Sequence, residues 1–141
     1  MNMNPLEFRE KFKIYLDNID RYRKFVRLLN RGKENRLLYW QEKVMNSFCE
    51  KYTIEFPSFE HLKVIFAICE LHNEPLKQGA VKVFAGHIDY SREYDNACAE
   101  KFPNSYMSEI NGPKELYGKY IDINFCSACR EAEKQWKQKN A

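Results

Sequence analysis

Two short cysteine- and histidine-containing pairs dominate this sequence: Cys69-Glu70-Leu71-His72 near its middle and Cys126-Ser127-Ala128-Cys129 near its C-terminus. Each pair places two metal-binding side chains on either side of a two-residue gap. A gap of this length lets one tight turn direct both side chains at the same ion, and zinc prefers four nitrogen or sulfur ligands in a tetrahedron. The spacing therefore predicts one zinc ion per chain. Its ligands would be Cys69, His72, Cys126 and Cys129.

The sequence around the two pairs predicts a small α+β domain. Residues 63–68 are rich in β-forming side chains and run into Cys69, and residues 120–125 alternate in polarity before Cys126. Gln78-Gly79 is typical of a turn. The other elements expected in this half are a strand over residues 81–84, a helix over residues 91–101, and a helix from Cys129 to the C-terminus.

Residues 1–56 predict a helical hairpin. Apolar side chains recur at steps of three and four residues, which is the period of one helix face. They are Phe8, Phe12, Tyr15, Ile19, Tyr22, Val26 and Leu29. Asn30-Arg31-Gly32 predicts the end of the first helix, and a second helix is expected from about Glu34 to Tyr52. In the α+β fold that we expect, this hairpin packs on the antiparallel sheet, zinc knuckles and C-terminal helix of residues 57–141.

The paired metal-binding turns are similar to those of zinc ribbons and treble clefs. The second pair begins a helix, which is closer to the treble clef, and the similarity covers roughly residues 63–139. Together with Phe102-Pro103-Asn104 and the run from Cys129 to Trp136, the pairs resemble a family of small uncharacterised bacterial proteins. That resemblance implies a zinc-held fold and no activity. The interval from His72 to Cys126 is longer than in small zinc fingers, so a folded segment is expected between them.

Other interpretations of these residues remain open. Cys69 can be a buried small hydrophobe with His72 on the surface, and the Cys126–Cys129 pair can belong to a thiol redox protein. Too few residues follow Cys129 to complete a thioredoxin-like fold. If zinc binds, four protein ligands leave no position for water, so the metal is predicted to be structural. The two remaining cysteines, Cys49 and Cys98, are expected in the core.

Composition favours a folded protein outside the membrane. The chain is 44% apolar with a net charge of +3, which is unlike disordered segments. Its apolar runs are too short to span a bilayer, and its N-terminus does not resemble a secretory signal. We expect a cytoplasmic location, where thiols stay reduced and paired cysteines favour metal binding over disulfides.

Positive charge is concentrated in the first half of the chain. Residues 1–55 carry 12 basic and 8 acidic side chains, whereas residues 56–141 carry 11 and 12. The stripe from Arg21 to Arg36 holds seven basic side chains and only Glu34 as an acid. A nucleic-acid-binding protein is therefore one hypothesis, and a solvated helix face is the alternative. The contacts on the first hypothesis would be Arg23, Lys24, Arg27 and Arg31.

The sequence contains no phosphate-binding loop and no residue order typical of nucleophilic catalysis, so an enzyme is not expected. His87, followed by Asp89, leaves an HNH-like nuclease as a further alternative. The favoured function is a zinc-stabilised, non-enzymatic binding module that acts through protein–protein contact, such as an inhibitor, an immunity-type protein or an adaptor. The aromatic face of the N-terminal helices also allows a homodimer.

Overall fold

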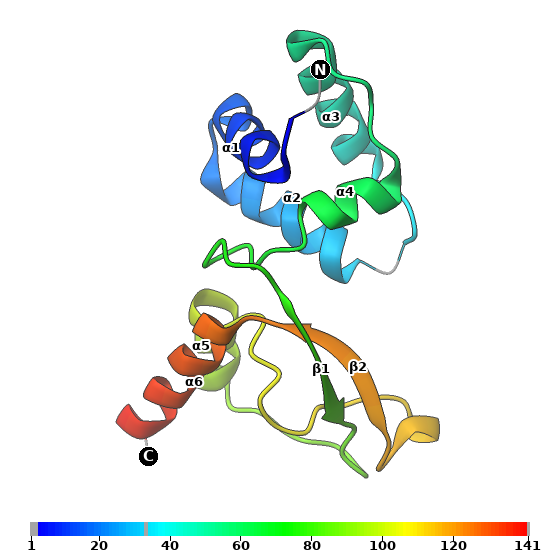
Figure 1. Ribbon diagram of the computed structural model, residues 1–141. Helices are drawn as coiled ribbons and strands as arrows, with labels where there is room; N and C mark the ends of the chain where they lie inside the picture. Colours follow the sequence, from blue (N-terminus) through cyan, green and yellow to red (C-terminus); the bar gives the residue numbers. More distant parts are fainter. Residues whose placement is uncertain (1–2, 33, 141) are drawn as a thin grey trace. The chain divides into compact units, whose positions relative to one another are not determined.

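A computed structural model describes residues 3–32 and 34–140 (Figure 1). The described residues form six α-helices, one short 3-10 helix and one two-stranded antiparallel sheet, which confirms the α+β class. The chain divides into two compact units after Glu70. Among the helices of the described ranges, none has the length and apolar character needed to cross a membrane.

The first unit consists of four helices. They are α1 (Pro5–Leu16), α2 (Ile19–Arg31), α3 (Tyr39–Tyr52) and α4 (Phe59–Ile65). The apolar stripe expected on one long helix is divided between α1 and α2. Asp17 adopts the left-handed conformation (φ 47°) and ends α1, and the Asn18 side chain accepts a hydrogen bond from the Arg21 amide to cap α2.

The core of the first unit is mainly aromatic. The Phe12 ring meets those of Phe25, Phe48 and Phe66 edge-on, with centroids 4.8, 5.2 and 5.6 Å away. All four side chains are fully buried. Five members of the predicted apolar stripe are buried in this unit: Phe8, Phe12, Tyr22, Val26 and Leu29.

The strand predicted over residues 63–68 is wrong, because its first half belongs to helix α4. Ser58 Oγ accepts a hydrogen bond from the His61 amide and caps this helix. Leu62 and Ile65 are buried at helical spacing, whereas Val64 is 67% exposed. Packing onto the aromatic core thus overrides the β-propensity of this run. Helix α4 belongs to the first unit, which extends to Glu70.

The second unit is built on two strands and two α-helices. Strand β1 (Lys77–Lys82) pairs antiparallel with β2 (Tyr120–Phe125), in register from Lys77 opposite Phe125 to Lys82 opposite Tyr120. The prediction for residues 120–125 is confirmed. The strand expected at 81–84 begins earlier, includes the predicted turn at Gln78-Gly79, and ends at Lys82.

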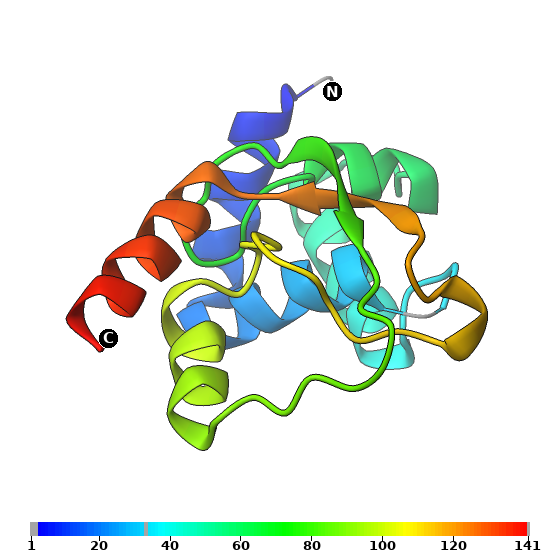
Figure 2. The same ribbon diagram turned by 90° about the horizontal axis from the view of Figure 1, so that it is seen from below.

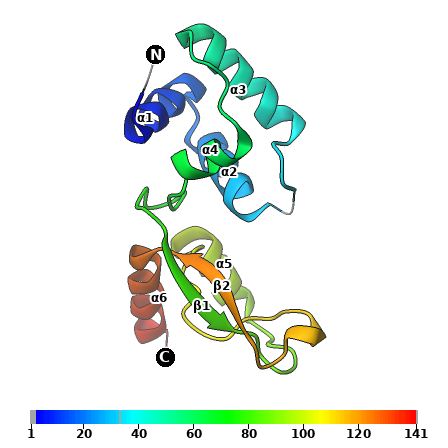
Figure 3. The ribbon, with the colours of Figure 1, turned by 45° about the vertical axis from the view of Figure 1, so that its right-hand side comes forward.

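Two helical segments lie within the long connection from β1 to β2. They are α5 (Arg92–Lys101), as predicted, and the 3-10 helix η1 (Lys114–Leu116). Helix α6 (Ser127–Lys139) follows β2 almost directly. Helices α5 and α6 pack against each other, as two further views show (Figures 2 and 3). This packing brings the connection close to the start of α6.

Candidate metal centre

The structure brings the four predicted ligands together. One donor atom from each of Cys69, His72, Cys126 and Cys129 lies within 4.8 Å of the other three. The cysteines are buried, and His72 is half-buried. Cys69 precedes a turn at residues 70–72, and Cys126 is the N-cap of α6. His72, Cys126 and Cys129 thus belong to the second unit, and Cys69 stands two residues before its start, at the end of the first unit.

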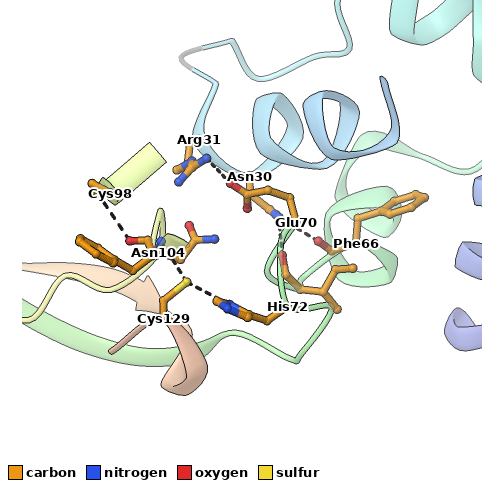
Figure 4. Close-up of polar contacts among 10 residues, drawn as sticks. Asn30, Arg31, Phe66, Glu70, His72, Cys98, Asn104 and Cys129 are labelled. Carbon is orange, nitrogen blue, oxygen red and sulfur yellow. Dashed lines mark hydrogen bonds and ion pairs between the residues drawn. The ribbon is translucent and has the colours of Figure 1, made fainter. Parts of the chain in front are cut away.

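The two nitrogen–sulfur distances of His72 match those of a tetrahedral zinc site. His72 Nδ1 lies 3.3 Å from Cys129 Sγ and 3.6 Å from Cys126 Sγ, and the imidazole ring points at Cys129 (Figure 4). Zinc binds sulfur at about 2.3 Å and nitrogen at about 2.0 Å, so the sulfur–nitrogen edge of the tetrahedron is about 3.5 Å. The residues therefore fit one such ion, with Nδ1 as the histidine ligand.

Backbone amides are directed at two of the sulfur atoms. The Cys129 amide donates to Cys126 Sγ at 3.4 Å. The Asn104 amide donates to Cys129 Sγ, also at 3.4 Å (Figure 4). The first turn of α6 adds the partial positive charge of a helix N-terminus. Both effects favour negative charge on sulfur, and the thiolate is the form of cysteine that binds metals.

Arg130 holds the loop that supplies the Asn104 amide. Its Nε donates to the Ser105 carbonyl at 2.8 Å and its Nη2 to the Tyr106 carbonyl at 3.1 Å. The guanidinium also lies 3.5 Å from the centroid of the Phe125 ring. The Asn104 carbonyl in turn accepts from the Cys126 amide at 2.9 Å. The loop, β2 and the first turn of α6 are thus fixed together around two of the ligands.

A buried carboxylate supports the same region one turn further along α6. Glu133 is 1% exposed, and its Oε1 accepts hydrogen bonds from Tyr94 on α5 at 3.0 Å and from Ser105 at 2.7 Å. Its Oε2 lies 2.9 Å from Lys137 Nζ. Burial acts to raise the pKa of Glu133, but the Lys137 ammonium and the two hydroxyls outweigh it and hold the pKa below its usual value.

The four predicted nucleic-acid contacts all lie on α2 but differ in their surroundings. Lys24 and Arg27 are exposed, and Arg23 is half-buried. Arg31 forms an ion pair with Glu70, whose side chain is nearly buried (Figure 4). Lys33, a member of the predicted stripe, lies outside the described residues.

The remaining candidates from the sequence are not part of the cluster. His87 Nε2 lies 3.1 Å from a carboxylate oxygen of Asp89, and both side chains are strongly exposed. Cys49 is buried in the first unit, where burial raises the pKa of its thiol. Cys98 is half-buried, and its Sγ lies 3.7 Å from the Phe102 carbonyl (Figure 4). Neither cysteine supplies one of the four converging donor atoms.

The roles of Asn104, Arg130 and Glu133 at this site cannot be predicted from the sequence. Arg130 and Glu133 resemble ordinary charged positions on an exposed helix, and Asn104 follows a proline that only indicates a helix end. Comparisons of the chain with protein-family models, curated proteins and solved structures found no match. What the structure establishes is that four side chains are placed to hold one metal ion.

Proposed function

We propose that this protein is a zinc-stabilised, non-enzymatic binding module that acts through protein–protein contact. The observation that carries the proposal is the convergence of three cysteine sulfurs and one imidazole nitrogen within 4.8 Å of one another. Such a donor set suits zinc, whereas magnesium and calcium prefer oxygen ligands.

The proposed role of zinc is structural. Four protein ligands would complete its coordination and leave no position for water or substrate. Their order along the chain supports the treble-clef interpretation: a turn with the first pair, two antiparallel strands, and a helix that begins with the second pair. The unfolded chain cannot preform this arrangement, so the free energy of zinc binding would contribute to folding.

Contact with another protein is supported by a concave, partly apolar surface on the second unit. A wide, shallow depression of about 560 Å³ is lined by Phe84, His87, Ile88, Tyr90, Ser108 and Glu109. A neighbouring cavity of about 170 Å³ shares Tyr90, Ser108 and Glu109 and adds Met107. Exposed apolar side chains gathered in this way are typical of interaction sites. We call this surface the Tyr90 depression.

Metal content is the first test. Native mass spectrometry and elemental analysis of protein purified without added metal should find one zinc ion per chain. Cys126→Ser combined with Cys129→Ser should abolish binding. Cys98→Ser is the matched control, because it also removes a thiol from the second unit but should retain the ion. Absence of zinc from the unaltered protein, or its retention in the double variant, would refute the metal site.

Partner binding requires a separate test. The unaltered protein and a Tyr90→Ala, Met107→Ala variant would be compared in affinity capture followed by mass spectrometry. A specific partner should be retained by the first and lost by the second. Tyr120→Ala is the control, since Tyr120 is 70% exposed and is not among the residues that line either cavity. All variants should keep one zinc ion, so a failure of contact can be distinguished from a failure of the metal site.

A further inference from the structure

The first unit has a basic and aromatic surface that has no part in the metal centre. It is formed by α2 and the start of α3, and we call it the α2–α3 surface. Its members are Arg21, Lys24, Arg27, Tyr39 and Trp40.

Some basic side chains of this unit make contacts within it: Arg9 Nη1 donates to the Ile65 carbonyl at 2.7 Å, and Arg31 pairs with Glu70. Arg21, Lys24 and Arg27 on α2 are exposed instead. In the described part of the chain, no ion pair links these three to a carboxylate. Their positive charge is therefore available to an external anion.

The three cations follow one side of α2 at intervals of three residues. Residues three positions apart are neighbours on a helix surface, with their Cβ atoms about 5–6 Å apart. Lys24 therefore lies between Arg21 and Arg27. Like charges held this close repel one another, and an anionic chain lying along them would relieve that repulsion. Two exposed acidic side chains also occur on these helices, Asp20 in the first turn of α2 and Glu42 in the first turn of α3. Helix N-termini favour acidic side chains, which accounts for their positions.

Trp40, at the start of α3, adjoins this row. Arg21 Cζ and Lys24 Nζ lie 5.7 and 5.8 Å from the centroid of the Trp40 ring. Trp40 itself packs edge-on against buried Phe25, with centroids 6.0 Å apart. Its position is thus fixed by the core, and the two cations lie against a rigid support. Tyr39, the residue before it, is 81% exposed, so its ring is open to solvent.

We propose that the α2–α3 surface binds single-stranded nucleic acid. Arg21, Lys24 and Arg27 contact successive phosphates, and Tyr39 stacks on a base. Positive side chains together with an accessible ring are the two components by which proteins bind single strands without sequence preference. An unpaired strand fits better than a duplex, because only unpaired bases expose a face to Tyr39. This site is independent of the function proposed for the second unit.

Fluorescence anisotropy of the full-length, zinc-loaded protein with labelled 15-nucleotide dT and rU strands tests the proposal. Three phosphate contacts predict a slope of roughly −2 for log affinity against log salt, which is about a twentyfold loss between 50 and 200 mM salt. Arg21→Ala, Lys24→Ala and Arg27→Ala together should abolish this slope and most of the binding. Tyr39→Ala should weaken binding roughly tenfold without changing the slope, whereas Tyr39→Phe should bind normally.

The matched control removes three other exposed lysines of the first unit. Lys13→Ala, Lys51→Ala and Lys63→Ala give the same change in net charge at positions outside the α2–α3 surface. This variant should keep nearly full affinity. The proposal is overturned if the unaltered protein does not bind at 50 mM salt, or if the control triple variant loses as much affinity as the surface variant. Binding to phosphatidylserine vesicles without binding to either strand would also overturn it.

Discussion

At the scale of single residues, Glu133 is a carboxylate buried in the second unit. Its carboxylate accepts from Tyr94 and Ser105 and pairs with Lys137, so it joins α5, the loop at residues 103–106 and α6. Glu133→Gln keeps the size of the side chain but removes the charge. We expect the unfolding free energy of this unit to fall by about 1.5–3 kcal/mol at pH 7, the usual range for charge-assisted hydrogen bonds.

The measurement is denaturant unfolding followed by the fluorescence of Trp136, which lies on α6 near Tyr94. Glu131→Gln on the same helix is the control, because Glu131 is exposed and should change stability little. Equal stability of the two variants would show that the Glu133 interactions contribute nothing net.

Tyr22 gives the first unit a defined dependence on alkaline pH. Burial raises the pKa of its hydroxyl from 10.0 to about 12, although the charge of Arg9 acts in the opposite direction. Because the pKa is higher in the folded state, the protonated hydroxyl contributes to the unfolding free energy, and this contribution is complete below pH 10. It is lost progressively as the pH rises toward about 12. Across this interval the unfolding free energy of the unaltered protein should decrease by roughly 2–3 kcal/mol through Tyr22, and Tyr22→Phe should remove that decrease.

This dependence can be isolated by comparing two variants in parallel. Unfolding of the first unit is followed by Trp40 fluorescence in a Trp136→Phe background, for Tyr22→Phe and for the exposed control Tyr39→Phe. Subtraction removes the titration of all other groups. Identical pH profiles for the two variants would contradict the assignment of the alkaline loss to Tyr22.

The sequence allowed the four candidate ligands to be predicted but not their surroundings. Two-residue gaps are a local property, so Cys69–His72 and Cys126–Cys129 are visible without a fold. The roles of Glu133 and Arg130 depend on α5 and on the loop at residues 103–106, which only the tertiary structure brings to α6. Periodicity alone assigns both side chains to a solvated face.

At the scale of elements, the sequence-based predictions fail at short segments that are compatible with two structures. Residues 63–68 suit a buried strand by composition, yet Leu62 and Ile65 also have helical spacing, and a run of this length does not decide between them. Gln78-Gly79 resembles a turn but lies in β1, where a Cβ at Gly79 would approach the Phe125 ring to 3.0 Å. Long periodic segments such as α3, and the alternating residues 120–125, were predictable because their signals extend further.

Two serine caps allow helices α4 and α5 to be tested with one substitution each. Ser58 Oγ accepts from the His61 amide at the start of α4, and Ser91 Oγ accepts from the Tyr94 amide at the start of α5. Alanine at either position leaves a helix-terminal amide without this partner and should cost about 1 kcal/mol. Ser58→Ala should destabilise the first unit, reported by Trp40, and Ser91→Ala the second, reported by Trp136. A loss in the opposite unit would contradict the assignment of α4 to the first.

At the scale of the whole molecule, each compact unit has its own core and one of the two tryptophans. Trp40 packs on Phe25 in the first unit, whereas Trp136 packs near Tyr94 and Phe102 in the second. The apolar cluster of the first unit is formed by residues between Phe8 and Ile68, none of which is a candidate metal ligand. The proposed zinc ion should therefore matter unequally to the two units.

Removal of the metal should unfold the second unit and leave the first folded. Cys126 and Cys129 fix the start of α6, and without the ion three buried thiols and an imidazole lose their common partner. With a chelator, a Trp40→Phe variant should show the red-shifted emission of an exposed Trp136. A Trp136→Phe variant should keep the emission of Trp40, and added zinc should restore the first signal. If both tryptophans respond together, the first unit also depends on the ion. If neither responds although the ion has left, the site does not stabilise the fold, and its role must lie in binding or in thiol chemistry.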